Sequence, residues 1–373
     1  MSARRKLGRA SPDKRDLAAC VLALAREASK EHERAAATAL LATLQPDRTQ
    51  LNLPWTDHFS MRICDGRELE RALAQARGKG SDNPAVESFL SDLQEEPVER
   101  ALSQPPLLEA LAHLADGFPN FREVVTFLVG RTALALLEPC SPLLLPPLIL
   151  DGPPGVGKTA FATALAHALD VPLLTLQLGH ATGPFDLGGM DPKFQGGGPG
   201  LLVRTVALGR AVDPLVLLDE IDKVPSDRNH DPIGPLYSLL EPSTAKRFID
   251  DGIKLPLNLS YVRWICTTND VRRLPAAIAS RCQIFSIAAP TSNEGRAIAR
   301  KVYAGMVREQ AWGRHFVAEL PDDVADLLAS STPRELTRVL QNALGLAALE
   351  QRPTLRVTDF TPAEPPRRGP GFF

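Results

Sequence analysis

Residues 148–159 read Leu-Ile-Leu-Asp-Gly-Pro-Pro-Gly-Val-Gly-Lys-Thr, an apolar run followed by the pattern G-x-x-x-x-G-K-[ST]. An alanine-rich helical stretch, residues 160–169, comes next. Such a strand, loop and helix bind phosphates, because glycines let backbone N–H groups turn toward the anion and the helix N-terminus adds partial positive charge. The sequence therefore predicts a phosphate-binding loop made of Gly152, Pro153, Pro154, Gly155, Val156, Gly157, Lys158 and Thr159.

Two side chains of this loop and two acids downstream predict the chemistry of the site. Lys158 is expected to reach the β- and γ-phosphates of ATP, and the Thr159 hydroxyl to bind Mg²⁺. Residues 215–220 read Leu-Val-Leu-Leu-Asp-Glu, an apolar strand that ends in two carboxylates. Asp219 would hold Mg²⁺, and Glu220 would orient the attacking water. Acids after a strand also cap helices, but the phosphate loop upstream favours the nucleotide interpretation.

The fold class follows from short apolar runs that alternate with helical stretches, which is typical of a parallel α/β sheet. After Pro290 the pattern is helical, from Asn293 to Gln351, and helical patterns also fill much of the first hundred residues. The expected strands are Leu148–Asp151, Pro172–Gln177, Leu215–Asp219, Val262–Thr268 and Gln283–Ile287. Helices are expected at Asp16–Leu44, Gly66–Arg77, Val86–Leu93, Pro106–Leu114 and Phe121–Leu137.

Composition narrows the class of protein. The chain has 42 Lys plus Arg and 44 Asp plus Glu, a balance that gives no indication of nucleic-acid binding. None of the five cysteines forms a C-x-x-C pair, which favours reduced thiols in a cytoplasmic protein. The longest apolar stretch, Leu143–Leu150, is far shorter than a membrane span, so no membrane association is expected.

The stretch between residues 193 and 269 resembles the ATPase module of the Lon family, a branch of the AAA+ ATPases. The resemblance rests on the order and spacing of short segments and extends over about residues 121–358, but not over the first hundred. The matching segments are Lys193-Phe194-Gln195-Gly196, Pro199-Gly200, Leu217–Lys223, Asp231-Pro232 and Leu239–Pro242. It implies a parallel sheet sandwiched by helices, a helical lid and a homo-oligomeric ring of six subunits. The expected domains are a helical N-terminal domain (1–105), the α/β ATPase core (106–290), the lid (291–358) and a flexible tail (359–373).

The resemblance assigns further roles. Asn269 matches the sensor-1 position near the γ-phosphate, and Arg281 matches the arginine finger that reaches a neighbouring subunit's site. Arg334 resembles the sensor-2 arginine of the lid, which contacts the γ-phosphate of its own subunit. The alternatives are a turn residue for Asn269 and surface ion pairs for the two arginines. Phe194 matches an aromatic that lines the central pore and grips polypeptide; the alternative is a plug packed onto its own domain.

The leading hypothesis is therefore an ATP-driven ring that unfolds or remodels proteins, as a chaperone does. Only a short proline-rich stretch follows Thr358, so we expect no serine–lysine peptidase domain of the Lon type. One alternative is the ATPase subunit of a protease whose peptidase is a separate chain, with Gly369–Phe373 as a docking tail. The other is a nucleotide-controlled assembly switch or scaffold with slow turnover.

Overall fold

The computed structural model describes residues 60–78, 83–106, 108–136, 142–178, 184–224 and 231–360. The helix expected at Asp16–Leu44 and the tail segment Gly369–Phe373 lie outside these residues. The chain separates into two compact units, which are described one at a time. The first contains the described residues up to 115, 121–152 and 158–287, and the second contains 116–120, 153–157 and the residues from 288 onward. The domain boundaries expected at 105, 290 and 358 remain a proposal.

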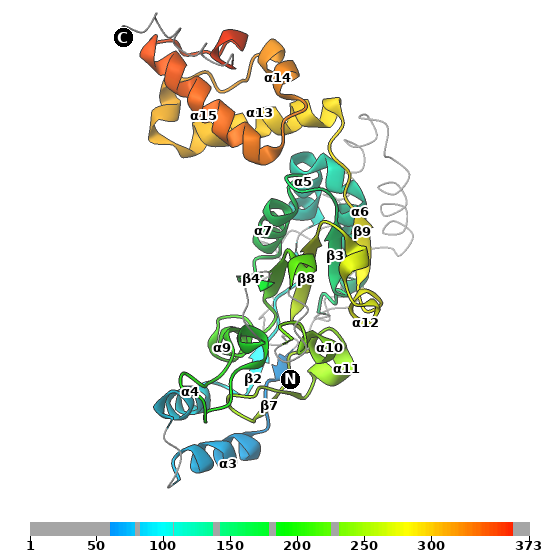
Figure 1. Ribbon diagram of the computed structural model, residues 1–373, viewed down its shortest axis with the longest axis vertical. Coiled ribbons are helices and arrows are strands. Elements are labelled where there is room, and N and C mark those ends of the chain that lie inside the picture. The colour runs from blue at the N-terminus through cyan, green and yellow to red at the C-terminus, as the bar shows by residue number, and fades with distance from the viewer. Residues whose placement is uncertain are drawn as a thin grey trace, which may run out of the picture. The chain divides into compact units, whose positions relative to one another are not determined.

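A five-stranded sheet forms the centre of the first unit (Figure 1). Its strands are β3 (Leu148–Asp151), β4 (Leu173–Gln177), β5 (Leu215–Asp219), β8 (Arg263–Thr268) and β9 (Gln283–Ser286). They run parallel in the order β4-β5-β8-β3-β9, which confirms the predicted strands and the fold class. Every residue of β8 is buried, as expected for a central strand covered on both faces. Because β8 lies between β3 and β5, the ends of these three strands come together at one edge.

Helices cover this sheet. They are α5 (Leu108–Gly117), α6 (Arg122–Ala135), α7 (Lys158–Leu169) and the shorter α12 (Ala276–Ala279). Helix α7 packs against β5 and β8 through an apolar face that includes Leu165, and its Phe161 ring stacks on Phe121 with centroids 4.5 Å apart. This packing fixes the position of α7 against the sheet.

The described part of the N-terminal region adds a small α/β layer to the same unit. Strand β1 (Ser60–Arg62) pairs antiparallel with β2 (Glu99–Ala101), and the predicted helices appear between them as α3 (Gly66–Ala76) and α4 (Pro84–Glu95). The two strands were not predicted, because each has only three residues and their partners are distant in the sequence. One apolar core joins this layer to α8 (Phe185–Gly188), α9 (Leu201–Leu208), α10 (Leu236–Leu239) and the hairpin β6 (Phe248–Ile249) and β7 (Pro256–Leu257). The short helix α11 (Pro242–Ala245) packs against α10.

The second unit is helical, as predicted. It contains α13 (Ser292–Glu309), α14 (Asp322–Leu328) and α15 (Pro333–Leu349) around their own core. Capping boxes begin α13 and α15: Thr291 pairs with Glu294, and Thr332 with Glu335.

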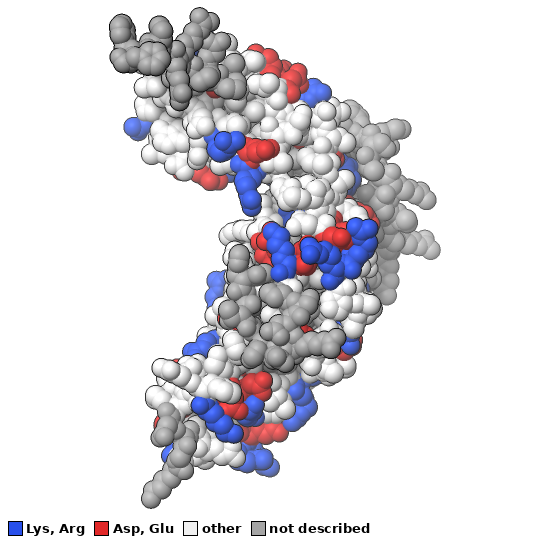
Figure 2. All heavy atoms as spheres, viewed as in Figure 1, with Lys and Arg blue, Asp and Glu red and all other residues white. Residues whose placement is uncertain are grey.

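The distribution of surface charge and the apolarity of the helices match what the composition predicted. On the face drawn in Figure 2, basic and acidic side chains of the described residues are intermixed, without a broad field of one sign. Among the described helices, none is long and apolar enough to cross a membrane.

Candidate nucleotide-binding site

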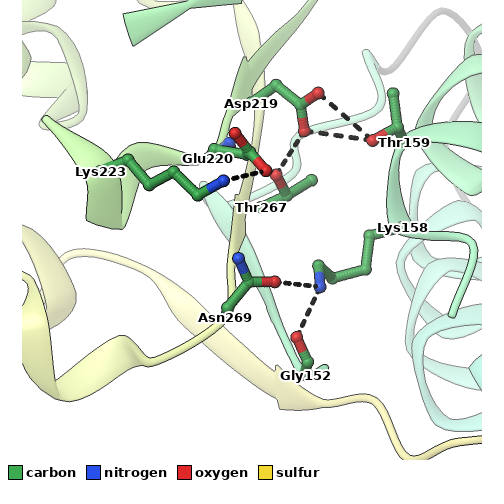
Figure 3. A network of polar contacts seen from close by, with 8 residues as sticks. All are labelled: Gly152, Lys158, Thr159, Asp219, Glu220, Lys223, Thr267 and Asn269. Carbon is green, nitrogen blue, oxygen red and sulfur yellow. Dashed lines mark hydrogen bonds and ion pairs between the residues drawn. The ribbon is translucent and has the colours of Figure 1, made fainter. Parts of the chain in front are cut away.

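Six of the predicted site residues meet where β3, β8 and β5 end (Figure 3), namely Gly152, Lys158, Thr159, Asp219, Glu220 and Asn269. Gly152 follows β3, Asn269 follows β8, and Asp219 is the last residue of β5. Lys158 and Thr159 begin α7 on the facing side. Segments that are separated in the sequence thus place a cation, two acids, a hydroxyl and an amide within one small region.

Lys158 is held by neutral oxygens. Its ammonium group donates to the Gly152 carbonyl at 2.5 Å and to Asn269 Oδ1 at 3.1 Å, and the residue is only 8% exposed. Burial lowers the pKa of Lys158, and the negative charges of four nearby acids partly offset this lowering. These acids are Asp151, Asp222, Asp219 and Glu220. A phosphate oxygen placed here could replace either neutral acceptor with a charge-assisted hydrogen bond.

The loop before Lys158 has the backbone that phosphate binding requires. Gly155 and Gly157 have φ values of +83° and +102°, in the region that residues with a Cβ rarely adopt. Their glycine identity is therefore needed for the path of the loop into α7.

The side chains of Thr159 and Asp219 bring together oxygen atoms that can act as metal ligands. The Thr159 hydroxyl lies 3.1 Å from Asp219 Oδ1 and 3.3 Å from Oδ2. Magnesium prefers oxygen ligands and commonly uses one or two protein groups together with phosphate oxygens and water. The pair fits the predicted Mg²⁺ site in its chemistry.

Thr267 links the two acids and was not recognised from the sequence. Its hydroxyl, on the buried strand β8, donates to Asp219 Oδ1 at 2.5 Å and accepts the Glu220 N–H at 2.9 Å. Glu220 has a left-handed backbone (φ 54°, ψ 46°), which is costly for a residue with a side chain. The Thr267 hydroxyl thus orients one acid through its carboxylate and the other through its backbone.

Removal of this hydroxyl should impair turnover more than nucleotide binding. For Thr267→Val, which conserves volume, we expect kcat for ATP hydrolysis to fall about 10-fold or more, since 1.4 kcal/mol corresponds to a factor of ten and the partly buried Glu220 N–H is left without its acceptor. Thr267→Ser restores the hydroxyl and should recover most of the rate. Steady-state kinetics with a separate ATP titration would test this, and equal rates for the Val and Ser variants would contradict it.

The Glu220 carboxylate is occupied by a neighbouring cation. Its Oε1 accepts from Lys223 Nζ at 2.7 Å, across the 3₁₀ turn Ile221–Lys223. Both side chains are about half exposed, so the ion pair is weak and exchangeable. Glu220 can therefore leave Lys223 to polarise a water molecule.

The other predicted residues lie outside this network. Arg281 follows α12, and its Nη1 donates to the Ala277 carbonyl of that helix. Arg334 is exposed in the first turn of α15, in the second unit. Phe194 is 65% exposed on residues 190–198, which we call the aromatic loop. None of the three takes part in the contacts of Figure 3, and their functions stay predictions.

Comparison with known proteins identifies the family and the relatives that this chain resembles. Residues 148–288 match the family model described as the ATPase family associated with various cellular activities (AAA). A Lon protease of Ureaplasma parvum is 28% identical over 283 residues, which cover 74% of this chain and 36% of the relative. A Lon protease of Mycolicibacterium smegmatis is 35% identical over 163 residues, covering 44% of this chain and 21% of the relative. The alignments thus span about a third or less of these relatives.

One solved structure supports the fold. The extended conformation of the S. cerevisiae Hsp104:casein complex is 15% identical, with a TM-score of 0.54. The likeness covers 75% of this chain and 52% of that chain. At this identity the similarity concerns the fold alone.

Proposed function

Since residues 148–288 form an AAA-type ATPase domain that resembles the ATPase region of Lon proteases, we propose that the chain is a motor subunit that works in a hexameric ring. In this proposal, the ring hydrolyses ATP to unfold or remodel other proteins. The observation that carries it is the convergence of Lys158, Asn269, Thr159 and Asp219 at one sheet edge, with Glu220 beside them.

Each side chain of this edge has a distinct task in hydrolysis. Lys158 neutralises the β- and γ-phosphates, and Asn269, which already contacts Lys158, positions the attacking water. Thr159 and Asp219 hold Mg²⁺, which when bound supplies positive charge to the phosphate oxygens. Glu220 orients and polarises the water once its carboxylate leaves Lys223.

Two arginines supply further positive charge, one from a neighbouring subunit and one from the same chain. Arg281 acts as a finger in the neighbouring subunit's site, and Arg334 contacts the γ-phosphate of its own subunit. Arginine suits both tasks, because its planar guanidinium binds phosphate oxygens through two parallel hydrogen bonds.

The exposed ring of Phe194 supports polypeptide as the substrate class. A side chain that is 65% exposed does not plug its own domain, and an aromatic ring offers apolar contact to many sequences. The relatives of this chain are named as proteases, whose substrates are polypeptides.

A substitution of Phe194 tests the proposal. Fluorescein-labelled casein serves as an unfolded polypeptide, and ATP turnover is measured with and without it. Wild-type turnover should rise with casein, whereas for Phe194→Ala the two rates should coincide, because the grip is lost. Leu349→Ala, which truncates another exposed apolar side chain, is the matched control and should keep the response. A Phe194→Ala variant that responds like wild type would contradict the gripping role.

The Glu220–Lys223 ion pair favours one second candidate, a nucleotide-controlled assembly switch. If the pair persists with ATP bound, binding would order an assembly and turnover would be slow. Mass photometry in ATP together with a phosphate-release assay separates the two functions. A motor forms rings and hydrolyses ATP, whereas a switch assembles with ATP that remains intact over the same period.

A further inference from the structure

The aromatic loop is closed by its own hydrogen bonds. Its two ends, Met190 and Gly198, exchange backbone hydrogen bonds of 2.9 and 2.8 Å. Between them, the Phe194 N–H donates to the Asp191 carbonyl at 3.0 Å, and the Gly197 N–H donates to the Phe194 carbonyl at 2.9 Å. Phe194 therefore stands on a defined protrusion, whose orientation depends on what holds the two ends.

A buried acid supports the base of the loop. Asp250 is fully buried, and it accepts the Gly200 N–H at 2.9 Å and the Gly252 N–H at 2.7 Å. Burial raises the pKa of Asp250 to about 6, and these backbone hydrogen bonds oppose the rise. On the other stem, a Cβ on Gly189 would lie 2.2 Å from Asp250 Oδ1, so only glycine fits. The residues on both sides of the loop, Gly189 and Gly200, thus pack closely against Asp250.

Helix α4 of the N-terminal layer holds the loop from the side. Asn83 caps α4, with Oδ1 accepting the N–H groups of Ala85 and Val86 at 3.1 and 3.3 Å. The other end of the same amide, Nδ2, donates to the Gly197 carbonyl at 2.7 Å, across 114 positions of sequence. One side chain therefore both begins the helix and binds the loop.

A second contact connects the same two elements. Arg204, on α9, donates from Nε to the Pro199 carbonyl at 3.1 Å, just beyond the loop. Its guanidinium lies over the Phe89 ring of α4, 5.9 Å from the centroid, which is within cation–π range. The C-terminal end of the loop is thus connected to α4 both directly and through Arg204.

We propose that Asn83 is a positioning residue that couples helix α4 to the aromatic loop, so that the N-terminal layer sets the orientation of Phe194. The proposal rests on the proposed function only where it extends to the grip on polypeptide. A partner or substrate bound to the N-terminal layer that shifts α4 would then shift the loop by the same contact.

The variant Asn83→Ser separates this contact from helix capping. Serine is as good an N-cap as asparagine, so α4 keeps its start, but its hydroxyl is too short to reach the Gly197 carbonyl. Asp65→Ser is the matched control. Asp65 caps α3 in the same layer, and its hydrogen bonds go to the N–H groups of Arg67 and Glu68 within that cap.

Two readouts on the full-length protein test the coupling and its consequence. Hydrogen exchange by mass spectrometry should show residues 190–198 exchanging about 3- to 10-fold faster in Asn83→Ser, since an intramolecular hydrogen bond contributes roughly that factor. The casein concentration that gives half-maximal ATPase stimulation should rise several-fold. Asp65→Ser should match wild type in both.

The outcomes distinguish the coupling from the proposed function. Unchanged exchange of residues 190–198 in Asn83→Ser overturns the coupling. Faster exchange with an unaltered casein response overturns the positioning of Phe194 for grip. If wild-type turnover ignores casein, the proposed function fails, and the exchange comparison alone still decides whether α4 holds the loop.

Discussion

Glu220→Gln is expected to lower kcat for ATP hydrolysis about 10²- to 10⁴-fold, the usual contribution of a general base. Glutamine keeps the size and the hydrogen-bonding reach of the side chain, but its neutral amide cannot act as a base toward the attacking water molecule. The Glu220 N–H would still bind Thr267, so the backbone turn should persist. Lys158, Thr159 and Asp219 are untouched, and ATP should therefore remain bound.

Three measurements together check this expectation. Steady-state turnover should fall, an ATP titration should give wild-type affinity or tighter, and mass photometry should show ATP-held rings. Lys223→Gln is the control, because it breaks the same 2.7 Å ion pair while leaving the carboxylate in place, and it should still hydrolyse ATP. Turnover by Glu220→Gln at the wild-type rate would remove Glu220 from the proposed mechanism.

Arg281→Ala is expected to lower kcat about 10³-fold or more, as loss of an arginine finger does in phosphoryl transfer. In the single chain, Arg281 donates to the Ala277 carbonyl of the preceding helix α12, and its Nε is buried without a hydrogen-bond partner among the described residues. The planar guanidinium can donate two parallel hydrogen bonds to a phosphate of an adjacent subunit once it leaves the Ala277 carbonyl.

Mixed rings show whether the finger acts between subunits. Arg281→Ala and Glu220→Gln chains are co-expressed with different tags and purified through both. A site formed by the Arg281→Ala chain has an intact Glu220 and receives Arg281 from its Glu220→Gln neighbour. Two inactive variants should therefore regain part of the wild-type turnover when combined. Mixed rings that stay as inactive as either variant would show that Arg281 does not act across the interface.

The phosphate-binding loop, the five strands and most described helices could be predicted because their signals are local. Each of three apolar runs in the sequence predicts a strand that is followed by polar residues. These polar residues are the phosphate-binding loop 152–159, Asp219 and Asn269. In a parallel sheet such strand ends share an edge, so Lys158, Thr159, Asp219 and Asn269 were expected together without coordinates.

Other features were not predictable because they depend on contacts with residues that are distant in the sequence. Thr267 is an ordinary strand residue until β8 is placed beside β5, where its hydroxyl meets Asp219 across 48 positions. Strands β1 and β2 have three residues each and are defined only by their pairing. Short segments have weak intrinsic preferences, and tertiary contacts decide their structure.

The sequence by itself thus determined the type of chemistry at the sheet edge, since phosphate binding needs a glycine-rich turn before a helix, and hydrolysis needs an acid after a strand. Only the tertiary structure decided which groups hold these residues in place. It brought Asn83 to Gly197 and Lys158 to Asn269, across 114 and 111 positions of sequence. A hydrogen bond depends on distance and direction in space, and chain folding, not local sequence, sets both.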